Sequence, residues 1–430
     1  RFTALGFIFE ENSMSFPVEG TLRALLLGTS LTALVPTLAA ADPAPSYPDL
    51  LRQAQTAPKV RAAQAGISQA EGLARQAGAR PNPTVSIESE NFSGNGPYKG
   101  TQVTETTASI EQTLELGGKR NARIDAGRAG IDLSRARVRQ TEADFTFELA
   151  EAYSAAEVGA LRVQLATDAQ TLAEDDARIA TAMVKAGKEA DLRSLQARTA
   201  VATARAELGE AQAARDTAFA RLTAMVGASN DFTSVPDSLL GHADRAEGVP
   251  AIDPLSTPAY QVALAERAEV SRRVKVEQTR ATPDVTVSLG VRQFQADNAQ
   301  ALVGGVSVPF PIFDRNKGNI AAVSAELTAA EENLNIARLD AQADIQSASA
   351  RLQASFARVK SAQDSESTAQ EAYHLTRIGY ESGKLPLSEL LIARRTLTEA
   401  RAQALTARQD RLIAEAELAR LAGTTPFGDL

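Results

Sequence analysis

The sequence contains no cysteine and no tryptophan, and it has only two histidines and three methionines. Without cysteine, the chain can form neither a disulfide bond nor a thiolate metal site, and it offers no thiol for a lipid anchor. His242 and His374 have no other histidine near them in the sequence, whereas a zinc site needs three or four ligands at recognisable spacing. We therefore expect no bound metal and no cofactor. No catalytic constellation appears, so we do not expect an enzyme.

Aromatic residues are scarce, and no long run of one charge sign is present. The net charge is −8, with arginine and glutamate interleaved, and no Lys/Arg block indicates a nucleic-acid surface. Alanine, glutamate, glutamine and arginine are abundant instead. This composition favours long helices that touch through small residues over a thick globular core.

Residues 1–41 carry the pattern of a cleavable secretory signal. Met14 is the expected start, so the residues before it read as upstream sequence. An apolar run at 24–38 leads to the small residues Ala39-Ala40-Ala41, which predicts cleavage before Asp42. This run is shorter than the ~20 apolar residues of a membrane-spanning helix, and no later stretch approaches that length. Any later membrane crossing would have to consist of strands.

The sequence contains nearly the same order of motifs twice. The segment PTVSI at 83–87 returns as PDVTV at 283–287, and the turn AGK at 186–188 returns as SGK at 382–384. Gly227 likewise has a counterpart in Gly423. An offset of about 200 residues is too long for a solenoid repeat and indicates two copies of one structural unit.

Each copy predicts the same order of elements. Alternating polar and apolar residues, as in VTVSL at 285–289, indicate strands, and a proline-free stretch such as 119–186 indicates a long helix. The first repeat, 42–226, is expected to contain a helix, a β-hairpin at 83–114, a long helix at 119–186 and a return helix at 191–226. An irregular connector follows at 227–257. The second repeat, 258–423, is expected to contain a helix, a hairpin at 284–310, a long helix at 315–382 and a return helix at 387–421, before a tail at 424–430.

Four strands per chain cannot close on themselves, because the smallest filled barrels need about eight. Open sheet edges in lipid leave backbone groups unpaired, so closure is required there. Three chains would supply twelve strands, an even number within the bacterial range. The long helices would reach ~100 Å beyond them. The predicted fold class is therefore a mixed α+β membrane protein, internally duplicated, in which a homotrimer forms a 12-stranded β-barrel and a long α-helical barrel.

Several motifs, in this order and spacing, carry a family resemblance. They are LELGGKR at 114–120, VSVPFPIFDRNKG at 306–318, and the two turns AGK and SGKLPLSELL at 186–188 and 382–391, each followed by Ala-Arg. In these motifs the chain resembles the TolC-type outer-membrane efflux proteins, and within them the heavy-metal, CzcC-like branch. The resemblance covers roughly residues 46–423.

The resemblance implies a function and partners. The chain would be the outer-membrane exit duct of a tripartite efflux system in a Gram-negative bacterium, with its helical barrel in the periplasm. Its partners would be outer-membrane lipid, a periplasmic adaptor and an inner-membrane pump of the resistance-nodulation-division type. The implied cargo is divalent heavy-metal cations of the cobalt, zinc and cadmium type, and this cargo rests on the resemblance alone.

The resemblance also implies where the functional residues lie. The two Gly-Lys turns read as ordinary helix C-caps, and in the family such turns form the periplasmic mouth, the gate and the adaptor docking site. The residues implied are Lys185, Gly187, Lys188, Glu189 and Asp191 at the first tip, and Arg377, Tyr380, Glu381, Gly383, Lys384 and Glu389 at the second. Gly117 and Gly118 in one repeat, and Pro309 and Pro311 in the other, lie where a strand must bend into a long helix.

Two alternatives remain at this stage. The first is an outer-membrane channel for drugs or for type I secretion. The second is a periplasmic coiled-coil scaffold or adaptor without a pore, which would have no lipid-facing strands. The purification of an ion-conducting trimer from outer membranes would separate the channel from the scaffold.

Overall fold

The computed structural model describes residues 42–244 and 248–428. The predicted signal at 1–41 lies outside the described residues, as do three residues of the predicted connector and the last two of the tail. Among the described residues, no helix combines the length and the apolar composition needed to cross a bilayer.

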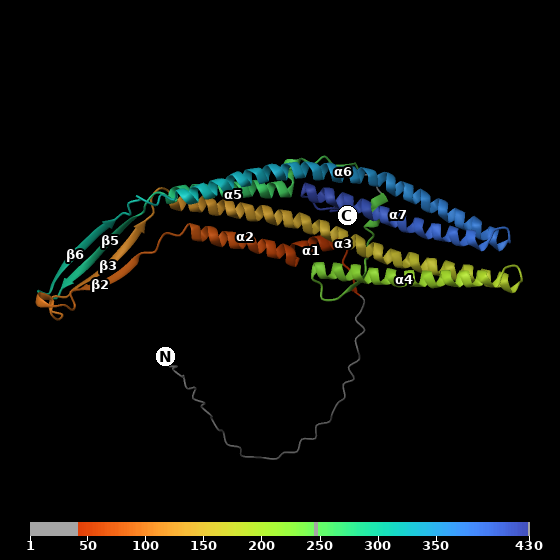
Figure 1. The fold of residues 1–430 in the computed structure, drawn as a ribbon, viewed down its shortest axis with the longest axis horizontal. Coiled ribbons are helices and arrows are strands. Elements are labelled where there is room, and N and C mark those ends of the chain that lie inside the picture. Colours follow the sequence, from red (N-terminus) through yellow and green to blue (C-terminus); the bar gives the residue numbers. More distant parts are fainter. Residues whose placement is uncertain (1–41, 245–247, 429–430) are drawn as a thin grey trace, which may run out of the picture. The chain divides into compact units, whose positions relative to one another are not determined.

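Helices make up most of the described chain, and two of them are very long (Figure 1). α3 has 67 residues and α6 has 65, so α3 extends ~100 Å at ~1.5 Å per residue. The helices are α1 (Tyr47–Gln53), α2 (Pro58–Ala77), α3 (Lys119–Lys185), α4 (Asp191–Val226), α5 (Pro258–Arg280), α6 (Lys317–Glu381) and α7 (Leu387–Ala422).

The four long strands form a single antiparallel sheet of order β2-β3-β5-β6. The strands are β2 (Thr84–Glu90), β3 (Glu105–Leu114), β5 (Val285–Phe294) and β6 (Ala299–Ser307). β3 pairs with β5 from Glu105↔Phe294 to Leu114↔Val285, so the hairpins of both repeats share one sheet. A short parallel pair joins β1 (Asp42–Pro43) to β4 (Phe232–Ser234) elsewhere in the chain.

The two faces of this sheet have opposite character. Cross-strand partners share a face, and the pairing puts large aliphatic side chains on one face and Ser, Thr, Gly, Glu and Arg on the other. Val303 and Phe294 are the large apolar exceptions on the polar face. The side chains of the aliphatic face are exposed, with Leu302 at 81%. They are Val85, Ile87, Ile110, Leu114, Val287, Leu289, Val291, Leu302 and Val306. One face of the sheet is therefore suited to an apolar medium and the other to water.

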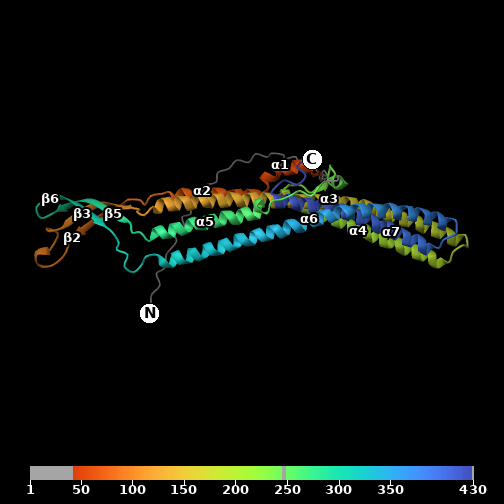
Figure 2. The same cartoon turned by 90° about the horizontal axis from the view of Figure 1, so that it is seen from above.

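The helices lie side by side and change neighbours along their length (Figures 1 and 2). α3 contacts α2 and α5 along one part and α4 and α7 along the other, and α6 contacts α5 and α7. Small residues permit these contacts. A Cβ added at Gly127 would lie 2.9 Å from Ala74 Cα of α2, and one added at Gly159 would lie 3.0 Å from Arg215 Cα of α4.

The internal duplication is visible in equivalent contacts. Each return helix ends at a glycine with positive φ, 70° at Gly227 and 69° at Gly423. Each of these glycines lies against the proline that begins the helix before the hairpin of the same repeat, α2 or α5. A Cβ added at Gly227 would be 3.6 Å from Pro58, and one at Gly423 would be 3.2 Å from Pro258. The mixed α+β, duplicated architecture predicted from the sequence is confirmed.

Two element boundaries differ from the predicted ones by more than one residue. α6 begins at Lys317 rather than at 315, because Asn316 adopts a left-handed conformation with φ 56°, which cannot belong to a helix. β6 ends at Ser307, before the predicted end of the hairpin at 310. Pro309 and Pro311 follow, and proline cannot donate a ladder hydrogen bond.

The thickest part of the core lies where the two repeats meet the connector. Tyr47 of α1 packs edge-on against Tyr153 of α3 and Phe427 of the tail, with ring centroids 5.5 and 6.1 Å apart. The Tyr47 hydroxyl donates to the carbonyl of Pro426 at 3.1 Å. Leu149 and Leu222 are fully buried in the same cluster. Segments from both ends of the described chain are thus fixed to the middle of α3.

A buried carboxylate holds the connector to this core. Glu157 of α3 is 5% exposed, and it accepts hydrogen bonds from Ser238 Oγ at 2.5 Å and from the backbone N–H groups of Leu239 and Leu240 at 2.9 and 3.1 Å. These donors lie at the start of the 3₁₀-helix η3 (Leu240–Asp244). Burial raises the pKa of Glu157, and the three hydrogen bonds oppose that shift.

We expect Glu157→Ala to lower the free energy of unfolding by about 3 kcal/mol, because it leaves three buried donors without their acceptor. Thermal unfolding of the detergent-purified protein measures the loss. Glu174→Ala is the matched control, since Glu174 lies on the same helix with its side chain 44% exposed, 3.9 Å from Arg205. An equal effect of the two substitutions would contradict the assigned role of Glu157.

Candidate functional site

The two helical tips have the same backbone geometry. At the α3–α4 tip, the N–H of Gly187 donates to Val184 O and that of Lys188 to Met183 O, both at 3.0 Å. At the α6–α7 tip, the N–H groups of Gly383 and Lys384 make the corresponding bonds to Tyr380 O and Gly379 O at 2.9 Å. This pair of bonds is the Schellman motif, which requires a left-handed residue after the helix.

Most of the predicted tip residues are exposed. Lys185, Gly187, Lys188 and Asp191 are exposed at the first tip, and Glu381, Gly383, Lys384 and Glu389 are exposed at the second. Glu189 and Arg377 are half-buried, and each pairs within its own hairpin. Arg193 approaches Glu189 at 3.6 Å, and Arg377 contacts Glu381 at 3.1 Å.

Tyr380 differs from the other predicted tip residues because it is buried, with 1% of its surface exposed. Its hydroxyl has no hydrogen-bond partner within the described part of the chain. Burial raises the pKa of Tyr380, and the charge of Glu189 on the other tip contributes to the same shift. The first tip therefore lies close to the buried face of the second.

A buried polar network joins the two hairpins behind the tips. Asp176 of α3 is fully buried, and its Oδ1 accepts a hydrogen bond from the Tyr373 hydroxyl of α6 at 3.2 Å. Arg394 Nε of α7 lies 3.9 Å from Asp176 Oδ2, which accepts no hydrogen bond from any described residue. The network thus connects the first repeat to both helices of the second, and its pairing is incomplete.

The environment of Asp176 shifts its titration. Burial raises the pKa of Asp176 to about 6, while the charge of Arg394, the Tyr373 hydrogen bond and the charge of Arg377 oppose the shift. Burial and the nearby Asp176 charge also raise the pKa of Tyr373 to about 12. The ionised form of Asp176 is consequently the unfavourable one in this packing.

An aliphatic cluster surrounds the network. Leu387 and Leu390 of α7 are fully buried together with Tyr380 and Leu397, and Ala180 of α3 closes the cluster from the first hairpin. Leu385 covers Gly379 so closely that a Cβ added there would lie 2.6 Å from Leu385 Cδ1. The second tip is therefore packed more tightly than the exposed first tip.

Sequence reasoning did not select Asp176, although a signal is present. The buried stripe of α3 at this end consists of Ala169, Ala173, Asp176 and Ala180, spaced as one face of a helix. An acid in an otherwise apolar stripe marks a buried charge that needs a partner. Tyr373 occupies a buried position of α6 and supplies that partner.

The first predicted strand-to-helix corner carries two glycines with left-handed backbone angles. Gly117 and Gly118 have φ values of 69° and 75°, and a Cβ added at Gly117 would lie 2.7 Å from Thr282 Oγ1. Asp284 of the second repeat receives the N–H of Leu116 at 3.1 Å and pairs with Lys119 at 2.7 Å. The first corner is thus fixed by the second repeat.

The second corner carries the prolines Pro309 and Pro311. Arg315 Nε donates to Pro311 O at 3.2 Å, and the Asn316 amide donates to Glu277 O of α5 at 2.8 Å. Both bonds join a side-chain N–H group to a backbone carbonyl, and neither contains a nucleophile or a general acid or base. These two bonds fix the backbone between the second corner and α6.

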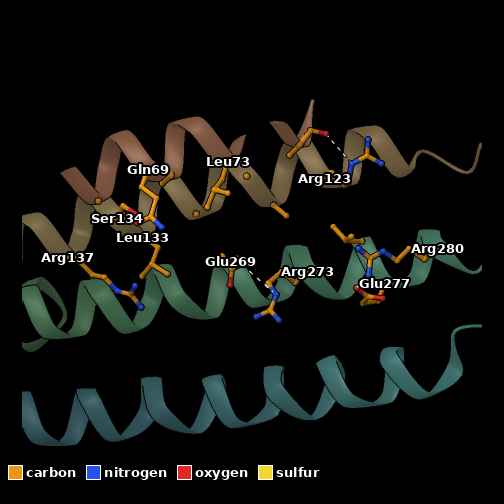
Figure 3. Close-up of a pocket in the computed structure, with 17 residues that line it drawn as sticks. Gln69, Leu73, Arg123, Leu133, Ser134, Arg137, Glu269, Arg273, Glu277 and Arg280 are labelled. Atoms are coloured by element: carbon orange, nitrogen blue, oxygen red, sulfur yellow. Dashed lines mark hydrogen bonds and ion pairs between the residues drawn. The ribbon is translucent and has the colours of Figure 1, made fainter. Parts of the chain in front are cut away.

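A groove of about 710 Å³ runs between α2, α3 and α5 (Figure 3). Arg273 of α5 contacts Glu326 of α6 at 2.6 Å and approaches Glu269 at 3.8 Å. Burial raises the pKa of Glu269, and the charge of Arg273 opposes the shift.

Within the described residues, no group of three or more His, Asp or Glu side chains is placed to hold a metal ion.

Comparison with known proteins identifies what the chain is similar to. The model of the family described as outer membrane efflux protein matches residues 50–228 and 255–424. The nickel and cobalt resistance protein CnrC of Cupriavidus metallidurans is 40% identical over 76% of this chain and 78% of its own length. The nickel-cobalt-cadmium resistance protein NccC of Alcaligenes xylosoxydans xylosoxydans is 36% identical over 93% of this chain and 92% of its own.

A solved structure of the outer-membrane channel OprN is similar in fold. It has a TM-score of 0.76 and covers 88% of this chain and 90% of its own, at 19% sequence identity. This likeness shows the arrangement of helices and strands alone.

We expect the contact between the two hairpins to weaken as pH rises. Because protonation removes the desolvation penalty of Asp176, the packed network is most stable below the ordinary pKa of 3.8 and loses about 3 kcal/mol as pH rises through about 6. The cysteine-free chain permits spin labels at Lys188→Cys and Lys384→Cys. Their distance distribution should be narrow at pH 5 and broader at pH 8.

Asp176→Asn, which stays neutral, should abolish this pH response and keep the distribution narrow. Asp175→Asn is the matched control, because Asp175 pairs with Arg178 at the surface, and it should retain the response. If Asp176→Asn responds to pH as the parent protein does, another group controls the tips.

Gly383→Ala should destabilise the second tip by about 1 kcal/mol, because its φ of 75° is strained for a residue with a Cβ. Gly318→Ala is the control, since Gly318 lies in the first turn of α6 with open space around it. Hydrogen exchange of the backbone amides at the end of α6 and the start of α7 measures the difference in stability. Equal protection in both variants would argue against a backbone requirement at the tip.

Proposed function

The chain belongs to the outer membrane efflux protein family, and we propose that three copies of it form the exit duct of a system that exports divalent heavy-metal cations. The observation that carries the proposal is the two-faced sheet, with exposed aliphatic side chains on one face and polar ones on the other. Such a sheet fits a wall between lipid and a water-filled passage.

Assembly follows from the sheet edges. Each of β2 and β6 pairs with one neighbour only, so each leaves one edge free within the described chain. The free edge of β6 in one copy can pair with that of β2 in the next, and three copies then give a closed ring of twelve strands. The two repeats, 42–226 and 258–423, supply six similar units to this ring, joined in each chain by the connector 227–257.

Charge on the polar face supports a cationic cargo. This face carries Glu88, Glu90, Glu105 and Glu111, and Arg292 is its one basic residue. A passage lined by carboxylates concentrates cations and repels anions. The relatives CnrC and NccC are named for resistance to nickel, cobalt and cadmium. Cobalt, nickel, cadmium and zinc are the cargo we propose.

The tips are proposed to form the periplasmic gate and the docking site for an adaptor. Exposed charged residues at both tips, Lys188 and Lys384 among them, are available to a partner. The Asp176–Tyr373–Arg394 network behind them is the contact that must change when the hairpins separate. We propose that a periplasmic adaptor and an inner-membrane pump of the resistance-nodulation-division type complete the system.

Deletion of the gene should increase the sensitivity of the native host to cobalt, nickel, zinc and cadmium, and a plasmid-borne copy should restore resistance. The control is antibiotic sensitivity, which should remain unchanged. The assay requires that pump and adaptor are expressed and that no redundant channel is present. Unchanged metal sensitivity under these conditions would refute the metal cargo, and a gain in antibiotic sensitivity alone would indicate drug efflux.

A further inference from the structure

Arg292 is the one basic residue in the four strands of the sheet, and it is held by both strands of the first hairpin. Its Nη1 lies 3.0 Å from Glu105 Oε2 of β3, and its Nη2 lies 3.3 Å from Glu90 Oε2 of β2. Its Nε donates to Thr107 Oγ1 at 2.9 Å. One guanidinium from the second repeat thus engages two carboxylates from the first.

The sheet register places these groups at the end of the sheet that is remote from the helices. Glu90 pairs with Glu105, and Thr107 pairs with Arg292 in the adjacent row. The loop between β2 and β3 begins directly after Glu90, and Figure 1 shows this end of the sheet farthest from α3. Under the proposed function, a cation meets these carboxylates last, just before it leaves the duct.

Carboxylates at the exit create a conflict for a duct that passes divalent cations. They attract the cation, but several free carboxylates close together are also oxygen ligands that can hold it. Conduction requires that binding be strong enough for entry and weak enough for release. Glu90 and Glu105 are cross-strand partners, so without a cationic partner each copy of the chain would offer two such ligands side by side.

We propose that Arg292 is a specificity-determining residue that keeps Glu90 and Glu105 engaged, so that the exit attracts divalent cations without retaining them. The guanidinium is suited to this role because its planar donors reach two carboxylates at once and its charge cannot be titrated away. Glu88 and Glu111 on the same face form no ion pair within the described part of the chain, and they keep the passage negative. This proposal rests on the proposed function, because it requires the polar face to line the duct.

The direct test is Co²⁺ and Ni²⁺ binding to the purified full-length protein in detergent, measured by isothermal titration calorimetry. Arg292→Gln should bind either ion about tenfold more tightly than the parent protein, because two carboxylates lose their cationic partner. The variant Arg292→Gln/Glu90→Gln/Glu105→Gln should lose this gain. Arg280→Gln is the matched control, since it frees Glu277 from an ion pair of 2.6 Å outside the sheet, and it should leave metal affinity unchanged.

Arg292→Lys provides a second test that does not depend on the assembly of the Gln variant. Lysine keeps the charge but pairs as a point charge, so it leaves one carboxylate less engaged. We expect its metal affinity to lie between those of the parent protein and Arg292→Gln. Unchanged affinity in Arg292→Lys and Arg292→Gln would overturn the proposal and leave Arg292 as a cross-strand ion pair that only stabilises the sheet.

Current through planar bilayers gives a functional measure. Millimolar Ni²⁺ added on the side of the strand loops should reduce the potassium current of Arg292→Gln about tenfold more effectively than that of the parent protein, and a chelator should restore it. Absence of current in the parent protein at pH 8, where the contact between the hairpins is weakest, would refute the proposed duct, whereas the calorimetric result reports on Arg292 separately. Equal Ni²⁺ block of both proteins would overturn the role of Arg292.

Discussion

The pairing of β3 with β5 is the constraint on which the rest of the described structure depends. It joins the hairpins of two repeats that are distant in sequence, and it brings the starts of α3 and α6 to the same end of the sheet. Its register also sorts every side chain. A slip of one residue would put the aliphatic side chains of β5 and β6 on the face that carries the polar side chains of β2 and β3. A sheet with two distinct faces therefore exists only because this one register is kept.

The helices pack differently from the sheet, because they bury few large apolar side chains along most of their length. Alanine and glycine let α3 approach α2 and α4 closely, and the thick part of the core is confined to the region around Tyr47 and Tyr153. Such an arrangement keeps both sides of the helical layer available to water. It also leaves the tips to be held by a small local cluster around Leu387 and Leu390, which is the kind of region that can open without unfolding the remainder.

Charged residues of one repeat contact residues of the other repeat in two places, behind the helical tips and at the loop end of the sheet. Asp176 of the first repeat is held by Tyr373 and Arg394 of the second, and Arg292 of the second repeat is held by Glu90 and Glu105 of the first. The two sites differ in burial. Asp176 is fully buried and incompletely paired, so its ionised form weakens the contact. Arg292 is partly exposed and paired twice, so it balances charge where water is present.

The sequence by itself determined the duplication, the two hairpins, the long helices and the glycine tips, because these depend on local periodicity and on residues with special backbone angles, such as Gly187 and Gly383. Only the tertiary structure decided which of these residues work together. The sequence predicts Tyr380 to be a tip residue, but its side chain is buried. Asp176 is one of many charged residues in the sequence, but it lies in a buried apolar stripe of α3. Burial, and the pairing of Arg292 with carboxylates from the other repeat, depend on contacts between segments remote in sequence, which local patterns do not encode.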